Sequence, residues 1–153
     1  MRTLLLCTAV AAIALFSLPQ AGSAGDPSIV VIANKAVTST ALSRDDLRNI
    51  FQTRKATWPN GMPVRPFNLP DSNALRQGFD LAVLGLDPAR VARFWIDRQV
   101  RGGERPPAVV PSSALMVRLV AKTVGSIGYV ESTRVNPSVK VVARLVDGQL
   151  VKP

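Results

Sequence analysis

Side chains that can donate hydrogen bonds to an anion are concentrated in the stretch NLPDSNALRQGF, residues 68–79. Asp71, Ser72 and Asn73 form a predicted turn, and Arg76 follows one helical turn later. The first backbone N–H groups of a helix have no partner inside the helix and carry partial positive charge, which attracts anions. Ser72 adds a hydroxyl, Asn73 an amide, and Arg76 a guanidinium able to form two parallel bonds. The stretch therefore predicts an oxyanion site formed by Asp71, Ser72, Asn73 and Arg76.

The same residues also fit a purely structural interpretation. Serine and asparagine are among the most common residues at the N-cap of a helix, where the side chain accepts a backbone hydrogen bond. Arg76 would then be a solvated surface charge. Both interpretations, an oxyanion site and a well-capped helix, follow from the sequence.

Other kinds of chemistry lack their characteristic residues. The chain has no histidine, its single cysteine is Cys7, and it has only ten acidic residues. Metal sites are built from clusters of these residue types, so neither a metal nor a cofactor is predicted. Nucleophilic catalysis needs a nucleophile with a positioned base, and the adjacent pair Asp45 and Asp46 fits the first turn of a helix better. Phosphate-binding glycine loops are also missing. We therefore expect a protein that is not an enzyme.

The charge of the chain points to an anionic partner. The formal net charge is +9. The basic residues are scattered, and no aromatic residues alternate with them as in a nucleic-acid stacking surface. A nucleic-acid partner is therefore not expected. A basic protein that is exported meets small oxyanions, acidic polymers and lipid head groups. Basicity that serves only solubility is the alternative.

Residues 1–24 have the pattern of a Sec-type signal peptide. Arg2 precedes the apolar run from Leu4 to Leu18, and small residues lead to a cleavage site after Ala24. We expect residues 25–153 to form one periplasmic or secreted domain. No later segment is apolar and long enough to cross a membrane, so the cleaved protein is not expected to span one.

Hydrophobic periodicity predicts alternating strands and helices. Strands are expected at residues 28–34, 62–69, 126–131 and 139–145, and the last continues through an Asp147-Gly148 turn into a hairpin. The prolines at 63 and 66 favour an edge position or an irregular course for the second strand. Helices are expected after Ser43, after Ser72 or Asn73, after Asp87 and after Ser112 or Ser113. The predicted fold is α/β, with a small mixed sheet flanked by about four helices.

Several of these segments resemble the phosphate-binding proteins of ABC importers. The stretch LSRDDLRNIFQTRKATWPNG, residues 42–61, is similar to their L-x-x-x-x-L-x-x-I-F-x-G-x-x-x-x-W segment, and residues 125–130 are similar to their G-x-I-G-Y-V strand. Short exported relatives with a single lobe share the W-P-N-G turn at 58–61, the V-L-G at 83–85, the two prolines at 106 and 107, and the V-K-V-V at 139–142. The chain resembles this short group, the phosphate ABC transporter substrate-binding-like proteins.

The resemblance implies a single lobe of the type II periplasmic-binding-protein fold. In the two-lobed proteins phosphate lies between the lobes, and their helix start reads R-S-D-G-S-G-T. Here the arginine is replaced by Leu69 or Pro70 and the threonine by Leu75, so the donors left are Ser72, Asn73 and Arg76. A one-sided site predicts weak binding unless a dimer or a partner closes the cleft.

Two functions remain open from the sequence. The first is an exported, non-enzymatic solute-binding-like protein that binds phosphate or a similar oxyanion for an ABC-type uptake or sensing system. The alternative is an envelope interaction module that keeps the fold and has lost the ligand. Its partner would be a membrane permease or sensor protein, held by the basic residues Arg90, Arg93, Arg98, Arg101 and Arg105.

Overall fold

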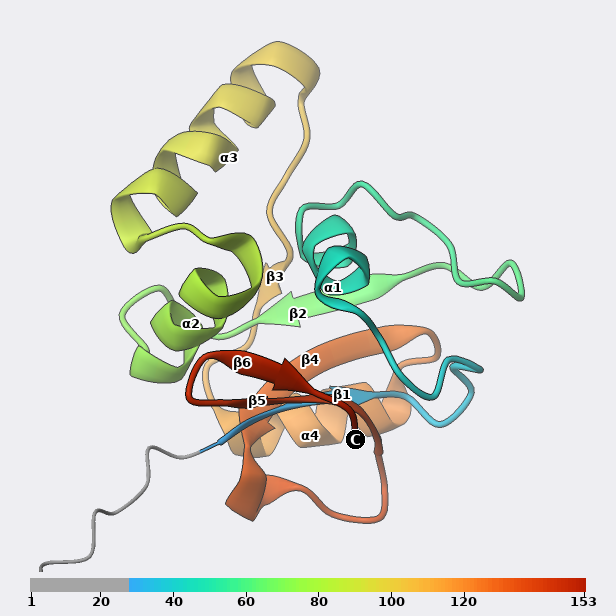
Figure 1. Ribbon diagram of the computed structural model, residues 1–153. Helices are drawn as coiled ribbons and strands as arrows, with labels where there is room; N and C mark the ends of the chain where they lie inside the picture. Colours follow the sequence, from blue (N-terminus) through green and yellow to red (C-terminus); the bar gives the residue numbers. More distant parts are fainter. Residues whose placement is uncertain (1–27) are drawn as a thin grey trace, which may run out of the picture.

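The computed structural model describes residues 28–153, which form an α/β domain around one mixed sheet (Figure 1). The predicted signal peptide, residues 1–24, lies outside the described residues. The sheet has the strand order β3-β2-β4-β1-β5-β6. The strands are β1 (Ile29–Ala33), β2 (Arg65–Asn68), β3 (Ala108–Val109), β4 (Ser126–Glu131), β5 (Lys140–Val146) and β6 (Gln149–Val151). The helices are α1 (Arg44–Phe51), α2 (Ala74–Phe79), the π-helix η1 (Asp80–Leu84), α3 (Pro88–Gly102), α4 (Ser113–Lys122) and the 3-10 turn η2 (Ser132–Arg134). The predicted fold class is confirmed.

Strand β4 lies inside the sheet and separates two helical layers. Successive side chains of a strand point to opposite faces. On one face Gly128 lies against Met116 and Val120 of α4, so closely that a side chain at position 128 would collide with Met116. On the other face the Tyr129 ring stacks on Phe79, with the ring centroids 3.9 Å apart. Helix α4 therefore covers one face of the sheet, and α2 covers the other.

Helix α1 begins at a complete capping box. The Ser43 hydroxyl accepts a hydrogen bond from the backbone N–H of Asp46, and the Asp46 carboxylate accepts one from the backbone N–H of Ser43. The hydrogen bond from the Ser43 hydroxyl is the main cause that lowers the pKa of Asp46. Asp46 also pairs with Lys55, and Asp45 pairs with Arg48. The two acidic residues have the structural role that the sequence predicts.

Two local predictions were wrong. Of the two alternatives for β2, the edge position is wrong, because the two-residue strand β3 pairs with its outer side. At regular helical spacing, Leu81 would join Leu75 and Leu84 on the apolar side of the helix that follows Asn73, but it is 62% exposed. The cause is the π-helix η1, which adds a residue to each turn and so rotates the apolar stripe until Val83 and Leu84 point inward instead.

Helix α3 extends away from the sheet (Figure 1). It begins at the Asp87 N-cap followed by Pro88, as predicted, and is held to the domain by the buried side chains of Val91 and Trp95. It runs through Gly102 and ends at Gly103, whose φ is +67°. Among residues 28–153, no helix is long and apolar enough to cross a membrane.

The turn before β4 gives a first testable prediction. Gly125 has a φ of +77°, and a Cβ at this position would overlap the carbonyl oxygen of Pro63. Its own carbonyl accepts a 2.8 Å hydrogen bond from the buried Trp58 indole. We expect Gly125→Ala to lower the free energy of unfolding by at least about 3 kcal/mol, because strain and collision add.

Gly61 provides the matched control for this substitution. Its φ is +81°, but no atom lies within 4 Å of a Cβ built there. Gly61→Ala should therefore lower the free energy of unfolding only by the cost of placing alanine at a positive φ, about 1 kcal/mol. Urea unfolding of both variants measures the difference, and equal losses would show that the contact with Pro63 does not matter.

Candidate functional site

The end of β2 is fixed by side chains rather than by another strand. The backbone N–H of Leu69 donates to the Tyr129 hydroxyl oxygen at 3.3 Å, and the Tyr129 hydroxyl donates to Asn68 Oδ1 at 3.3 Å. Burial raises the pKa of Tyr129, which keeps its proton available for this bond. Because Asn68 Oδ1 is an acceptor in this chain, the Asn68 amide nitrogen points away from Tyr129.

Arg76 lies in the interior of a polar cluster that also contains Asp71, Asp80 and Asn68, and it is not a solvated surface residue. Only 4% of the residue is exposed. Its Nε donates to Asp80 Oδ2 at 2.5 Å, and its Nη1 donates to the Leu69 carbonyl at 3.0 Å. The Asp71 carboxylate lies 3.3 Å from the same Nη1. One guanidinium thus links the end of β2, the turn before α2 and the start of η1.

The structure places the four predicted site residues in different roles. Asn73 is the N-cap of α2, and its side-chain oxygen accepts a 2.8 Å hydrogen bond from the backbone N–H of Leu75. Ser72 is exposed in the turn. Asp71 is an acceptor next to Arg76, and its own carbonyl accepts a bond from the Gln77 amide. Ser72, Arg76 and Asn73, whose Nδ2 is not used in the cap, therefore keep side-chain donors for an anion.

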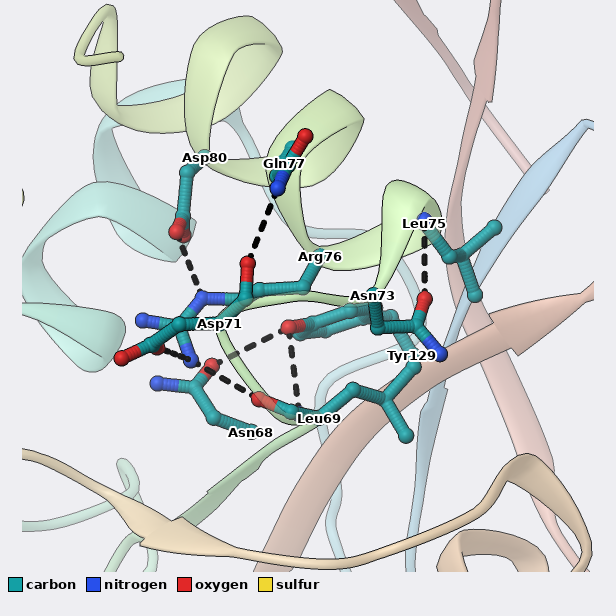
Figure 2. Close-up of polar contacts among 9 residues, drawn as sticks. All are labelled: Asn68, Leu69, Asp71, Asn73, Leu75, Arg76, Gln77, Asp80 and Tyr129. Atoms are coloured by element: carbon teal, nitrogen blue, oxygen red, sulfur yellow. Dashed lines mark hydrogen bonds and ion pairs between the residues drawn. The ribbon is translucent and has the colours of Figure 1, made fainter. Parts of the chain in front are cut away.

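Sequence reasoning missed a fifth residue, Asn68. It is 3% exposed, and its Nδ2 has no hydrogen-bond partner among residues 28–153; the same is true of Arg76 Nη2. Figure 2 shows both nitrogens without a dashed line, on the side of the cluster where the Asp71 carboxylate lies. The sequence indicates Asn68 only weakly, because the one sign of it is a polar residue at the end of an apolar strand.

The cluster contains one cation, Arg76, and two carboxylates, Asp71 and Asp80. Asp80 is buried, and burial raises its pKa above the ordinary value of 3.8, while the neighbouring Arg76 acts in the opposite direction. Asp71 is different, because 84% of its side chain is exposed to water. The Arg76–Asp80 pair is therefore a fixed part of the fold. The Arg76–Asp71 pair is an exposed contact of the kind that contributes little to stability and can exchange.

The second predicted surface, the basic side of α3, differs from the expectation in two residues, of which the first is Arg90, paired with Asp87 at 3.4 Å. Arg98 is half-buried, pairs with Glu104 and lies over the Phe94 ring at 5.3 Å from its centroid. It belongs to the helix's own packing. Arg93, Arg101 and Arg105 remain exposed and form no ion pair with another described residue. Residues 28–153 contain no group of three His, Cys, Asp or Glu side chains placed to hold a metal ion.

Comparison with solved structures identifies the fold. An ABC-type phosphate transport receptor from Vibrio cholerae matches with a TM-score of 0.60 and 19% identity, over 75% of this chain and 45% of the receptor. A putative phosphate ABC transporter substrate-binding protein with bound phosphate from Clostridium perfringens matches with a TM-score of 0.60 and 20% identity, over 79% and 45%. PstS from Borrelia burgdorferi matches with a TM-score of 0.59 and 15% identity, over 75% and 46%. No family model and no curated protein sequence matches the chain.

These matches show what the chain has in common with the binding proteins. The chain spans less than half the length of each of them. It has the fold of a single lobe of a type II periplasmic binding protein, as the sequence resemblance implied. At identities of 15–20% the likeness concerns the fold, and it does not transfer a ligand.

The buried ion pair generates a prediction about pH. Replacing Arg76 by leucine leaves the Asp80 carboxylate buried without a counter-charge, which should cost about 3–5 kcal/mol of unfolding free energy at pH 7. Without Arg76 the pKa of Asp80 rises further, since burial is then opposed by nothing. The loss should therefore shrink as the pH falls and Asp80 takes up a proton.

The double variant Arg76→Leu with Asp80→Leu is the control for this prediction. Because both charges are removed together, its stability should return most of the way to that of the wild type. Thermal unfolding between pH 4 and pH 8 measures all three proteins. A loss that is the same at every pH, or no recovery in the double variant, would contradict the account.

Proposed function

We propose that the protein is an exported, non-enzymatic solute-binding-like protein whose ligand is phosphate or a similar oxyanion. The observation that carries this proposal is the pair of buried side chains with unused donors, Asn68 Nδ2 and Arg76 Nη2. Neither nitrogen belongs to the fully buried side-chain atoms that lack a partner among residues 28–153, so both reach solvent. Two free donors on one side of the cluster can therefore bind an acceptor that arrives from outside.

In this proposal the Asp71 carboxylate occupies the position of the ligand when no ligand is bound. It lies 3.3 Å from Arg76 Nη1 and is exposed, so it can move into water when an oxyanion arrives. The oxyanion would accept bonds from Arg76 and Asn68, and the Ser72 hydroxyl could add a third donor. Asp80 stays in place and keeps the guanidinium oriented.

In this arrangement a single lobe would bind the oxyanion weakly. In three of the solved structures that share this fold, more than half of the chain lies outside the match, and one of these structures contains bound phosphate. A site on one lobe leaves its ligand partly in water, where charged hydrogen bonds are weaker. A partner such as a membrane permease or sensor in the envelope would supply the missing wall.

Removing the Asp71 carboxylate tests whether it competes with phosphate for Arg76. We expect Asp71→Asn to strengthen phosphate binding roughly fivefold, because an exposed carboxylate no longer competes for Arg76. Asn68→Asp should abolish binding, because it keeps the acceptor for Tyr129 and replaces the free donor with an acceptor. Calorimetric titration in buffer free of phosphate and sulfate measures both variants.

Asp97→Asn is the matched control for the change in charge. Asp97 is exposed on α3 and forms no ion pair with another described residue, so its removal should leave phosphate binding unchanged. Equal strengthening by Asp71→Asn and Asp97→Asn would indicate only a general effect of net charge. Absence of heat in every protein at millimolar phosphate would rule out phosphate as the ligand.

The alternative function, an interaction module of the envelope, is favoured by a different observation. Ile96 and Val100 lie one turn apart on α3, and they are 61% and 81% exposed. Exposed arginines, including Arg93 and Arg101, flank them. Large apolar side chains with a basic surround are typical of a surface that contacts another protein.

Photo-crosslinking in the native envelope distinguishes this alternative. A photoreactive residue at position 100 should give one discrete adduct with a membrane permease or sensor, and the adduct should disappear in Arg93→Glu with Arg101→Glu because the charge complementarity is lost. Arg134→Glu, on the 3-10 turn η2, is the control and should leave the adduct intact. A smear of adducts that ignores these charges would contradict a specific interface.

A further inference from the structure

A cavity lies on the side of α2 that faces away from Arg76. Its volume is about 540 Å³, and its apolar wall is formed by Ile29, Leu75, Gly78, Leu81, Ala82 and Leu145. Leu75, Gly78 and Ala82 follow one another at helical spacing, while Arg76 and Asp80 occupy the other side of the same helix. The cavity is therefore separate from the proposed oxyanion site. A mostly apolar cavity of this size is typical of sites for small ligands.

Two opposite charges line this cavity without pairing. Arg44 comes from the start of α1, and Asp147 comes from the turn between β5 and β6. Neither forms an ion pair with any described residue. Arg44 makes a single long bond, 3.4 Å from its Nη2 to the carbonyl oxygen of Gly148. A cation and an anion at one cavity, too far apart to pair, match a ligand that carries both charges.

The floor of the cavity is kept open by a glycine inside a helix. Gly78 is the second-last residue of α2, directly before η1 continues the helix, and glycine within a helix lowers its stability relative to alanine. A Cβ at this position would lie 3.4 Å from Ile29 Cδ1, which is ordinary contact and not a collision. Packing therefore does not demand glycine here. The empty space above Gly78 is space that a ligand can fill.

From these features we infer that the cavity binds a small zwitterion with an apolar body, such as a large apolar amino acid or a short apolar peptide. Its carboxylate would pair with Arg44, its ammonium group with Asp147, and its apolar side chain would contact Ile29, Leu75 and Leu145. This inference does not rest on the proposed oxyanion function, because no residue is shared by the two sites.

The experiment uses ligands that lack one charge at a time. L-phenylalanine and leucyl-leucine are titrated calorimetrically, together with N-acetyl-phenylalanine, which lacks the ammonium group, and phenylalanine amide, which lacks the carboxylate. Arg44→Gln should weaken L-phenylalanine and N-acetyl-phenylalanine by at least tenfold and leave the amide unchanged. Asp147→Asn should weaken the binding of L-phenylalanine and phenylalanine amide by at least tenfold and leave that of N-acetyl-phenylalanine unchanged. Asparagine tolerates the φ of +49° at this position.

Gly78→Leu fills the cavity and should abolish binding of every ligand in the set while the protein stays folded. Arg65→Gln, at an exposed position of β2, is the control and should change nothing. Tighter binding of leucyl-leucine than of phenylalanine would indicate that the ligand is a peptide. Tighter binding of phenylalanine would indicate that it is a free amino acid. The inference is overturned if no zwitterion gives saturable heat, or if Gly78→Leu leaves binding intact. Asn68→Asp should not affect these titrations, so failure here is distinguishable from failure of the phosphate site.

Discussion

The ion pair between Arg76 and Asp80 determines what the rest of the site can do. A guanidinium cannot be buried without a counter-charge, because removing a charge from water costs several kcal/mol. Asp80 supplies that charge from the first residue of η1, and the Leu69 carbonyl supplies a further acceptor from the end of β2. The pair therefore joins strand, turn and helix, and it also neutralises the cation that an anion would otherwise bind.

The donor atoms that stay available to a ligand are determined by geometry more than by net charge. Arg76 keeps one terminal nitrogen free, and the Tyr129 hydroxyl orients Asn68 so that its amide nitrogen is free as well. The exposed Asp71 carboxylate lies beside them, and a solvated carboxylate is held only weakly. A single lobe with this arrangement is suited to weak and exchangeable binding. More than half of each longer binding protein lies outside the part that this chain matches.

The elements of the fold could be predicted from the sequence where local signals were strong. The Ser43 capping box, the Asp87-Pro88 helix start and the Asp147-Gly148 turn fix their own conformation within four residues, and all were confirmed. The edge position of β2 was wrong because two residues far along the chain, Ala108 and Val109, cover it. Leu81 was misplaced because the hydrophobic pattern does not show where an α-helix becomes a π-helix.

The candidate site was harder to predict for a physical reason. Asp71, Ser72, Asn73 and Arg76 are adjacent in sequence, so they were found together. Their roles depend on partners that are remote or lie on the next turn: Tyr129, more than fifty residues away, and Asp80, one turn further along the helix. Charge cancellation by Asp80 and the free amide of Asn68 are therefore properties of the folded domain. Residue types and spacing alone do not contain them.

The most direct test is to observe the two free donors during a phosphate titration. Side-chain nitrogen resonances of Asn68 Nδ2 and of the Arg76 guanidinium can be followed by NMR in ¹⁵N-labelled protein. The account predicts that both move together and reach saturation at the same phosphate concentration, while the resonance of the exposed Arg93 does not. If the Asn68 and Arg76 resonances stay fixed while those of the α3 arginines shift, the cluster at the start of α2 is a structural cap and not a binding site.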